Sequence, residues 1–267
     1  MINENQGDRR LSQGVIKQEW IRACRLSPGK VGFADGCDSR VWEAINILLD
    51  EGAIDEALVF IEASKESFLS QEAIANLLRG SHDRIRVIKV AESSGQSCLQ
   101  LAADYLGRGE VDSVLAGNIS TTADVIRAAI KGVGLRTGSR TVSGSFVMVS
   151  PEGKPLLFAD CGVVVKPTVD QLVEIAFSSV ETWRYLMPEI VPKVAFLSFS
   201  TKGSASHPEA QKMRDAAQAF KTHYPHLIAD GEVQFDAAFV PHVARTKCPD
   251  SPLEGEANCF IFPDLNA

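Results

Sequence analysis

Residues 111–133 read VDSVLAGNISTTADVIRAAIKGV, and this stretch decides the fold class. Val111 to Ala116 is a short apolar run typical of a buried strand, whereas Ala123 to Val133 has the apolar spacing of an amphipathic helix. The segment between them is rich in Gly, Asn and hydroxyl residues, which is the composition of a loop. A strand, a loop and a helix in this order form the repeating unit of a parallel sheet with crossover helices.

The same alternation fills the chain upstream of this stretch. We predict strands at Val31–Asp35, Ala57–Ile61 and Arg84–Val90, and helices at Val41–Leu49, Gln71–Leu78 and Ser97–Leu106. Together with residues 111–133 these segments make four strand–helix units. Because crossover connections are right-handed, the units predict a doubly wound α/β sheet.

The pattern changes near residue 140. Two strands, Thr141–Val149 and Leu156–Ala159, follow each other without a helix, and the Pro and Gly residues between them predict a hairpin turn. The expected elements after the hairpin are a helix at Thr168–Arg184, a strand at Val194–Phe199, helices at Pro208–Phe220 and Phe235–Ala244, and a strand at Ala257–Phe262. We therefore predict a first α/β domain over residues 1–140 and a second over residues 141–267.

Composition excludes several classes of protein. With 27 basic and 34 acidic residues the net charge is −7, which argues against a nucleic-acid-binding protein. No apolar run approaches the roughly 20 residues of a membrane helix, and the first ten residues lack the apolar core of a signal peptide. We expect a cytoplasmic protein with no membrane or nucleic-acid partner.

The six cysteines are scattered, and no C-x-x-C pair occurs. Cys98, Cys161 and Cys259 lie in apolar segments, so we expect buried thiols and no disulfide framework. None of the five histidines belongs to a hydrolase or zinc-protease motif, and surface positions are expected for most of them. G-x-G-x-x-G is also absent, which argues against a nicotinamide cofactor.

The loop that ends at Asp124 is the first candidate site. Its hydroxyls and the N–H groups at the start of the following helix can bind an anion, with Arg127 one turn further on. The same residues also fit a plain helix cap, in which a Thr side chain accepts an N–H and Asp124 favours the helix dipole. The sequence leaves both alternatives open.

Ser198 to Ser204, with three serines, a lysine and a glycine, is the second candidate and suits phosphate, although it lacks the Walker A frame. The third candidate combines Ala159–Cys161 with the acidic segment Asp230–Asp236. Carboxylates can hold a metal ion, but no histidine belongs to either segment. Asp230 and Glu232 could equally cap or solvate a turn. We predict no metal site.

Eight short motifs, in order from about residue 110 to the end, resemble the phosphate acetyltransferase and phosphate butyryltransferase family. They are Thr121–Arg127, Thr141–Ser143, Phe158–Cys161, Pro167–Thr168, Glu174–Ala176, Ser198–Ser204, Asp230–Ala237 and Phe262–Leu265. Ala34–Gly36 and Asp38–Val41 are similar to the family's opening strand and helix.

This resemblance implies an isocitrate/isopropylmalate-dehydrogenase-like fold of two doubly wound α/β/α domains with the active cleft between them, and a homodimer. It implies transfer of a short acyl group, expected to be acetyl, between coenzyme A and inorganic phosphate. Coenzyme A, acetyl-CoA and acyl phosphate are then substrates, and no cofactor is permanently bound. Arg127 matches a family arginine implicated in substrate binding and catalysis, and Thr121 keeps the hydroxyl of a serine found in many members. The expected substrate-binding residues are Thr122, Asp124, Ser200, Thr201, Lys202, Gly203 and Ser204.

Members of the family continue beyond the point that corresponds to Ala267, with a Ser-Arg-Gly-Cys stretch and an aspartate proposed as the base. From the sequence we therefore expect a C-terminally shortened member, whose first domain lacks the segment that normally completes it. Three alternatives stay open: a phosphate acyltransferase, a non-catalytic module that binds acyl-CoA or acyl phosphate, and a structural subunit completed by a partner.

Overall fold

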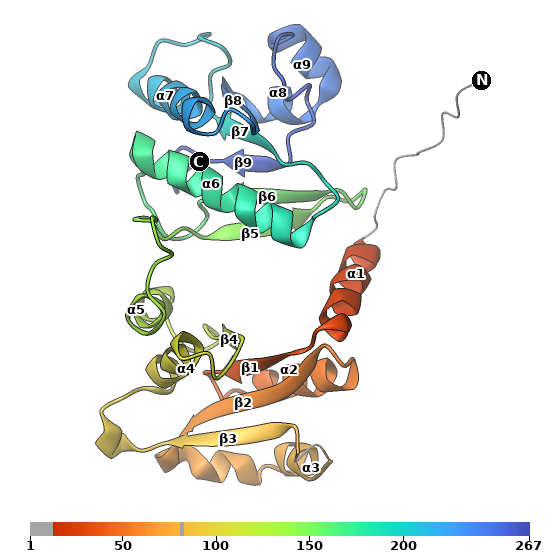
Figure 1. Ribbon diagram of the computed structural model, residues 1–267, viewed down its shortest axis with the longest axis vertical. Coiled ribbons are helices and arrows are strands. Elements are labelled where there is room, and N and C mark those ends of the chain that lie inside the picture. The colour runs from red at the N-terminus through yellow and green to blue at the C-terminus, as the bar shows by residue number, and fades with distance from the viewer. Residues whose placement is uncertain (1–12, 81–82) are drawn as a thin grey trace, which may run out of the picture. The chain divides into compact units, whose positions relative to one another are not determined.

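The computed structural model describes residues 13–80 and 83–267 (Figure 1). Two compact units divide the chain between Leu135 and Arg136. One unit covers Lys17–Leu135, and the other holds Arg136–Ala267 together with the start of the first helix. The expectations for the first ten residues and for His82 lie outside the described residues.

The unit of Lys17–Leu135 is built on a four-stranded parallel sheet with strand order β3-β2-β1-β4. Its strands are β1 (Gly29–Phe33), β2 (Ile54–Glu62), β3 (Ile85–Val90) and β4 (Ser113–Leu115). Its helices are the part of α1 (Gln13–Leu26) from Lys17 onward, α2 (Ser39–Asp50), α3 (Glu72–Gly80), α4 (Cys98–Gly107) and α5 (Thr122–Gly132), with 3-10 turns η1 (Ala63–Ser70) and η2 (Glu92–Ser94). The predicted doubly wound arrangement is confirmed, whereas α1 and the two 3-10 turns were not predicted.

Successive side chains of β2 point to opposite faces of the sheet, and both faces are apolar, so helices cover both. Ala57 and Val59 pack into a core with α2 and α3, whereas Leu58 and Phe60 face a second core with α4 and α5. All four side chains are fully buried, which is typical of a central parallel strand. Burial of side chains as large as Leu and Phe contributes about 1.5–3 kcal/mol each.

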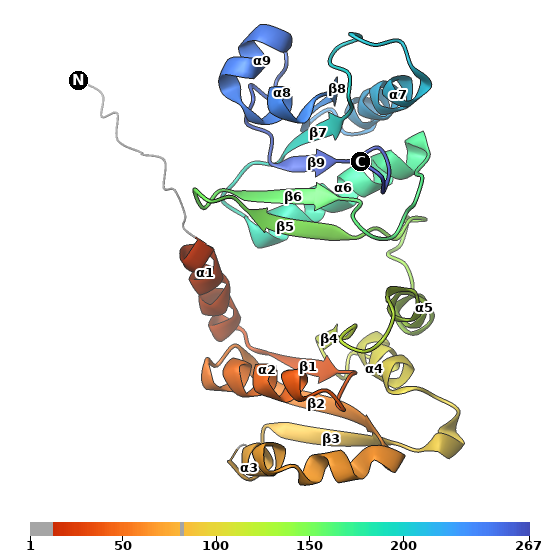
Figure 2. The same ribbon diagram turned by 180° about the vertical axis from the view of Figure 1, so that it is seen from behind.

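The unit of Arg136–Ala267 contains a five-stranded sheet of order β5-β6-β9-β7-β8, in which only the edge strand β5 runs antiparallel (Figure 2). Its strands are β5 (Ser145–Val149), β6 (Pro155–Ala159), β7 (Lys193–Leu197), β8 (Ile228–Val233) and β9 (Cys259–Ile261). Its helices are α6 (Val169–Leu186), α7 (Pro208–His223), α8 (Phe235–Phe239) and α9 (Pro241–Lys247). The hairpin of β5 and β6 is confirmed, although β5 begins only at Ser145.

Two predictions in this unit are wrong. The segment 235–244 forms two helices instead of one, because Pro241 has no N–H to continue the first helix and instead begins the second. Asp230 and Glu232 lie in the buried strand β8 and not in an acidic loop. Their charges are accommodated there by basic residues from elsewhere in the unit, as shown below.

The cysteines agree with expectation in part. All six thiols are free, and Cys259 is fully buried. Cys98 and Cys161 are only half-buried, which corrects the prediction of buried positions. The histidines at 207, 223, 226 and 242 are exposed, as expected.

Candidate functional site

The strand order of the first sheet creates a crevice for a ligand. The chain runs outward from β1 through β2 to β3 and then returns to place β4 on the other side of β1. The loops after β1 and β4 therefore leave the sheet in opposite directions, and ligands of open α/β sheets bind beside the carboxyl ends of such a strand pair.

A pocket of about 390 Å³ lies at this edge of the sheet, entirely within Lys17–Leu135. Residues that follow β1, β2 and β4 line it, together with the first turn of α4 and one face of α5. The polar and charged side chains among its lining residues are Asp35, Glu62, Lys65, Ser97, Gln100, Ser120, Asp124, Arg127 and Lys131, with the thiols of Cys37 and Cys98.

Asp35 fixes the loop that follows β4. One oxygen of its carboxylate, which is 3% exposed, accepts the N–H groups of Gly117 and Asn118, both at 2.8 Å. The other oxygen accepts the hydroxyl of Ser120 at 3.0 Å. These donors of the candidate anion-binding loop are therefore bound to a carboxylate of the protein itself. Asp35 thereby joins this loop to the end of β1.

Thr121 caps α5, as the plainer of the two sequence interpretations predicted. Its Oγ1 accepts the backbone N–H of Asp124 at 3.2 Å and donates its own proton to Oδ2 of Asp124 at 2.6 Å. Arg127 pairs with Oδ1 of the same carboxylate at 3.0 Å, and its side chain is 73% exposed. The hydrogen bond from Thr121, and then the charge of Arg127, hold the pKa of Asp124 below its usual range.

The pocket is also lined by Lys65 and Glu62, which pair at 2.9 Å, and by the two thiols. Burial raises the pKa of Cys98 to about 11 and also raises the pKa of Cys37. Both thiols are therefore protonated near neutral pH, so neither is prepared as a nucleophile.

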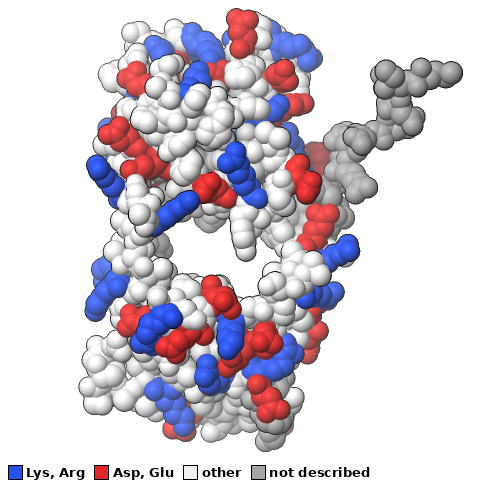
Figure 3. Space-filling model, viewed as in Figure 1, with Lys and Arg blue, Asp and Glu red and all other residues white. Residues whose placement is uncertain are grey.

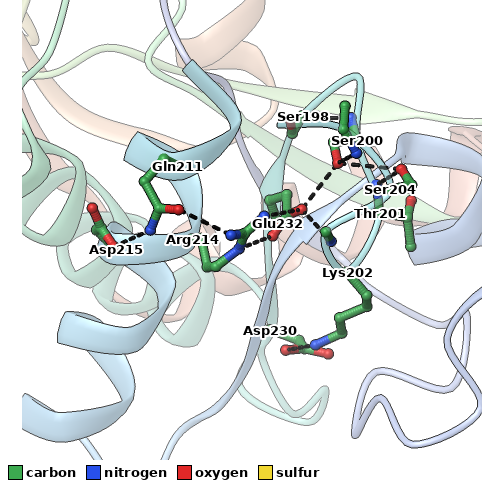
Figure 4. Close-up of polar contacts among 12 residues, drawn as sticks. Ser198, Ser200, Thr201, Lys202, Ser204, Gln211, Arg214, Asp215, Asp230 and Glu232 are labelled. Carbon is green, nitrogen blue, oxygen red and sulfur yellow. Dashed lines mark hydrogen bonds and ion pairs between the residues drawn. The ribbon is translucent and has the colours of Figure 1, made fainter. Parts of the chain in front are cut away.

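The second candidate loop, residues 198–204, belongs to the other unit and surrounds a buried carboxylate (Figure 4). Glu232 on β8 has a side chain that is 1% exposed. It accepts the N–H of Gly203 at 2.7 Å and the hydroxyl of Ser200 at 3.0 Å. Arg214 on α7 binds both of its oxygens, at 2.9 and 3.0 Å. Burial alone raises the pKa of Glu232, but these hydrogen bonds outweigh burial and lower the pKa to about 2.

Other donors of this loop are also used internally. Nζ of Lys202 contacts Oδ1 of Asp230 at 2.6 Å, and the N–H of Thr201 is donated to the hydroxyl of Ser204 at 3.0 Å. Although burial opposes ionisation of Asp230, Lys202 holds the pKa of this carboxyl below its usual range. The third candidate segment behaves similarly, because Asp160 accepts the N–H groups of residues 162, 163 and 164 at 2.6–3.0 Å.

The structure therefore brings together only part of the predicted site. Asp124 and Arg127 line the pocket, whereas Thr121 and Thr122 lie beside it at the start of α5 and do not line it. The other predicted substrate-binding residues lie in the second unit, in the loop around Glu232, and are Ser200, Thr201, Lys202, Gly203 and Ser204. Gly203 borders a separate pocket. Sequence reasoning missed Lys131, Lys65 and Glu62, although the spacing of Lys131 from Arg127 on one helix was a usable signal.

Charge is mixed on the face that Figure 3 shows, where basic and acidic side chains are interspersed in both units. Within the described residues, no group of three or more His, Cys, Asp and Glu side chains could hold a metal ion. Among the described helices, none combines the length and the apolar character needed to cross a membrane.

Comparison with known proteins identifies the class of protein. The family model described as phosphate acetyl/butaryl transferase matches residues 15–267. This chain belongs to that family of acyltransferases. Its α/β fold agrees with a solved phosphotransacetylase from Streptococcus pyogenes, with a TM-score of 0.82 and 30% identity over 96% of this chain and 83% of that one.

Two curated relatives are similar over most of their length. The phosphate acetyltransferase of Bacillus subtilis is 35% identical over 258 residues, which are 89% of this chain and 79% of the relative. The phosphate acetyltransferase of Thermoanaerobacterium thermosaccharolyticum is 33% identical over 275 residues, which are 94% of this chain and 84% of the relative.

Proposed function

We propose that this chain transfers a short acyl group, acetyl, between coenzyme A and inorganic phosphate at the pocket beside α5. The observation that carries the proposal is Arg127. This arginine lines a pocket at the ligand-binding edge of a doubly wound sheet, in a chain of the phosphate acyltransferase family.

The chemistry requires positive charge near the reacting atoms. The thiolate of coenzyme A attacks the carbonyl carbon of acetyl phosphate, and the bond from that carbon to the bridging oxygen breaks. The thiol proton goes to a base, and phosphate leaves with the electron pair. Negative charge develops on the carbonyl oxygen and on the departing phosphate, and a guanidinium and a helix N-terminus stabilise both.

In this proposal Arg127 contacts the phosphate, and Asp124 orients Arg127 through their ion pair at 3.0 Å. Thr121 contributes by capping α5, because its hydroxyl proton is already donated to Asp124. Catalytic contact by Thr121 and substrate contacts by Thr122 and by residues 200–204 stay predictions. The same holds for the cytoplasmic location, which six free thiols support, and for a homodimer.

A steady-state assay of coenzyme A acetylation from acetyl phosphate tests the proposal. We expect turnover by the wild-type chain and a fall in kcat/KM of about 100-fold or more in Arg127→Ala, the scale of losing one transition-state donor. Arg108→Ala is the matched control, because Arg108 is an exposed arginine of the same unit that pairs with Glu110 outside the pocket. Its kcat/KM should stay at the wild-type value.

Two results would overturn the proposal. Equal activity of the two variants would remove Arg127 from the reaction. Binding of coenzyme A by a folded wild-type chain that shows no turnover would identify a binding module in place of an enzyme.

A further inference from the structure

Two aspartates join the neighbouring strands β1 and β4 at opposite ends. At the amino end, Asp112 comes directly before β4 and accepts the N–H of Lys30 in β1 at 2.7 Å. At the carboxyl end, Asp35 comes two residues after β1 and accepts three donors from the loop of residues 117–120. Of these two aspartates, only Asp35 lines the pocket. The same kind of contact therefore occurs once beside the candidate site and once away from it.

The conformation of this loop depends on the carboxylate of Asp35. Gly117 has a φ of +103°, which residues with a side chain rarely adopt, and its N–H and that of Asn118 both reach Oδ2 at 2.8 Å. Oδ1 accepts the hydroxyl of Ser120 at 3.0 Å. An asparagine in place of Asp35 would offer one acceptor oxygen and would place an NH2 group against these donors. Binding all three donors with both oxygens therefore requires a carboxylate.

The loop leads directly into α5, which carries Arg127. Thr121 caps this helix and donates its hydroxyl proton to Asp124, which in turn pairs with Arg127 at 3.0 Å. Because the side chain of Arg127 is 73% exposed, packing does little to hold it. A series of contacts therefore connects Asp35 to Arg127 through the loop and the cap of the helix.

The two ends of α5 are held by different parts of its unit. Its last turn lies against α4, where a methyl group on Gly132 would be 2.7 Å from a backbone carbon of Ala103. Its N-terminal end follows the loop that is bound to Asp35. Loss of the carboxylate should therefore displace the first two turns of α5, which carry Arg127, while the rest of the helix stays in place.

We propose that Asp35 is a positioning residue for Arg127 in the acyl-transfer reaction. The inference rests on the proposed function. Asp35 is 3% exposed and both of its oxygens are occupied, so it acts through the loop and not by contact with a substrate. A misplacement of about 1 Å can lower a reaction rate by about 100-fold, so a small movement of Arg127 is sufficient for a large effect.

A double-mutant cycle on kcat/KM with Asp35→Asn and Arg127→Ala tests the proposal. We expect Asp35→Asn alone to lower kcat/KM by about tenfold or more. In the Arg127→Ala background the same substitution should lower it by less than about twofold, because the group through which Asp35 acts is already absent. A residue that only stabilises the fold would lower kcat/KM by the same factor in both backgrounds.

Asp112→Asn is the matched control, because it removes the corresponding carboxylate from the other end of the same strand pair, outside the pocket. Its kcat/KM should stay at the wild-type value. If Asp35→Asn does not fold, Ser120→Ala replaces it in the cycle, since it removes one of the three contacts and keeps the carboxylate.

Two results of the cycle would overturn the inference: equal factors in the two backgrounds, or an unchanged kcat/KM in Asp35→Asn. If the wild-type chain shows no turnover, the proposed function fails, and hydrogen exchange then tests the positioning by itself. The amides of residues 121–127 should exchange faster in Asp35→Asn than in Asp112→Asn, and equal exchange in the two variants would refute the inference.

Discussion

Replacing Glu232 by glutamine should destabilise the unit that contains it by about 3 kcal/mol at neutral pH. The substitution preserves the shape of the side chain but removes the charge that binds Arg214 and the loop of residues 198–204. The pKa of Glu232 falls from 4.5 to about 2 in the folded chain, and a depression of this size corresponds to about 3 kcal/mol. With 1% of the side chain exposed, solvent provides little screening.

The pH dependence follows from the direction of the pKa change. Because the folded pKa is lowered, the stabilisation by ionised Glu232 is fully present above the unfolded value of 4.5 and is lost as the pH falls toward about 2. The difference in unfolding free energy between wild type and Glu232→Gln should therefore be constant between pH 5 and 8 and should decrease at lower pH.

Urea unfolding followed by the fluorescence of Trp183 measures this difference in the correct unit. Trp183 on α6 is buried, and replacing Trp20 and Trp42 by phenylalanine leaves it as the only fluorophore among the three tryptophans. Glu256→Gln is the matched control, because Glu256 pairs with Lys193 at 2.9 Å but is 56% exposed. An exposed pair contributes about 0–1 kcal/mol. A Glu232→Gln effect no larger than that of the control, or one that persists unchanged at pH 3, would refute the reasoning.

Three further outcomes are expected. Asp35→Ala leaves the donors of the loop after β4 without their acceptor and should destabilise its unit by about 1–3 kcal/mol in thermal melts. Gly132→Ala places a methyl group 2.7 Å from a backbone carbon on α4 and should lower the unfolding free energy by about 1–3 kcal/mol, whereas Gly80→Ala, with open space around it, should be nearly neutral. Alkylation followed by peptide mapping should modify exposed Cys24 first, and Cys98 should react faster as the pH rises toward its pKa of about 11. Rapid reaction of Cys98 at neutral pH would contradict the effect of burial on its pKa.

The fold could be predicted wherever apolar periodicity dominates. The strand at Ala57–Ile61 and the helix at Ser97–Leu106 lie within one to three residues of β2 and α4, since both have uninterrupted apolar patterns. Strand β8 was missed because two of its six residues are acidic and a third is glycine. Its two acids are neutralised within the unit by Arg214, Lys202 and Lys221, which come from other segments of the chain.

Of the three cations that line the pocket, the sequence predicted only Arg127, and it did not predict the internal partners of the candidate loops. Arg127 follows from its place one turn into a helix after a hydroxyl-rich loop. The carboxylates that occupy the candidate loops could not be inferred, because Asp35 is about eighty residues from the N–H groups that it accepts. A loop that offers several donors in the sequence can use many of them within the protein.

Glu232 can be regarded as a ligand that is covalently attached to its own receptor. The amide of Gly203, the hydroxyl of Ser200 and the guanidinium of Arg214 form an oxyanion receptor, and the chain supplies the oxyanion from β8. Because attachment makes the local concentration of that carboxylate very high, a dissolved anion competes poorly for the same donors. Shortening this side chain, as in Glu232→Gly, would leave the receptor vacant, and formate or acetate in the buffer could then restore stability by binding in its place.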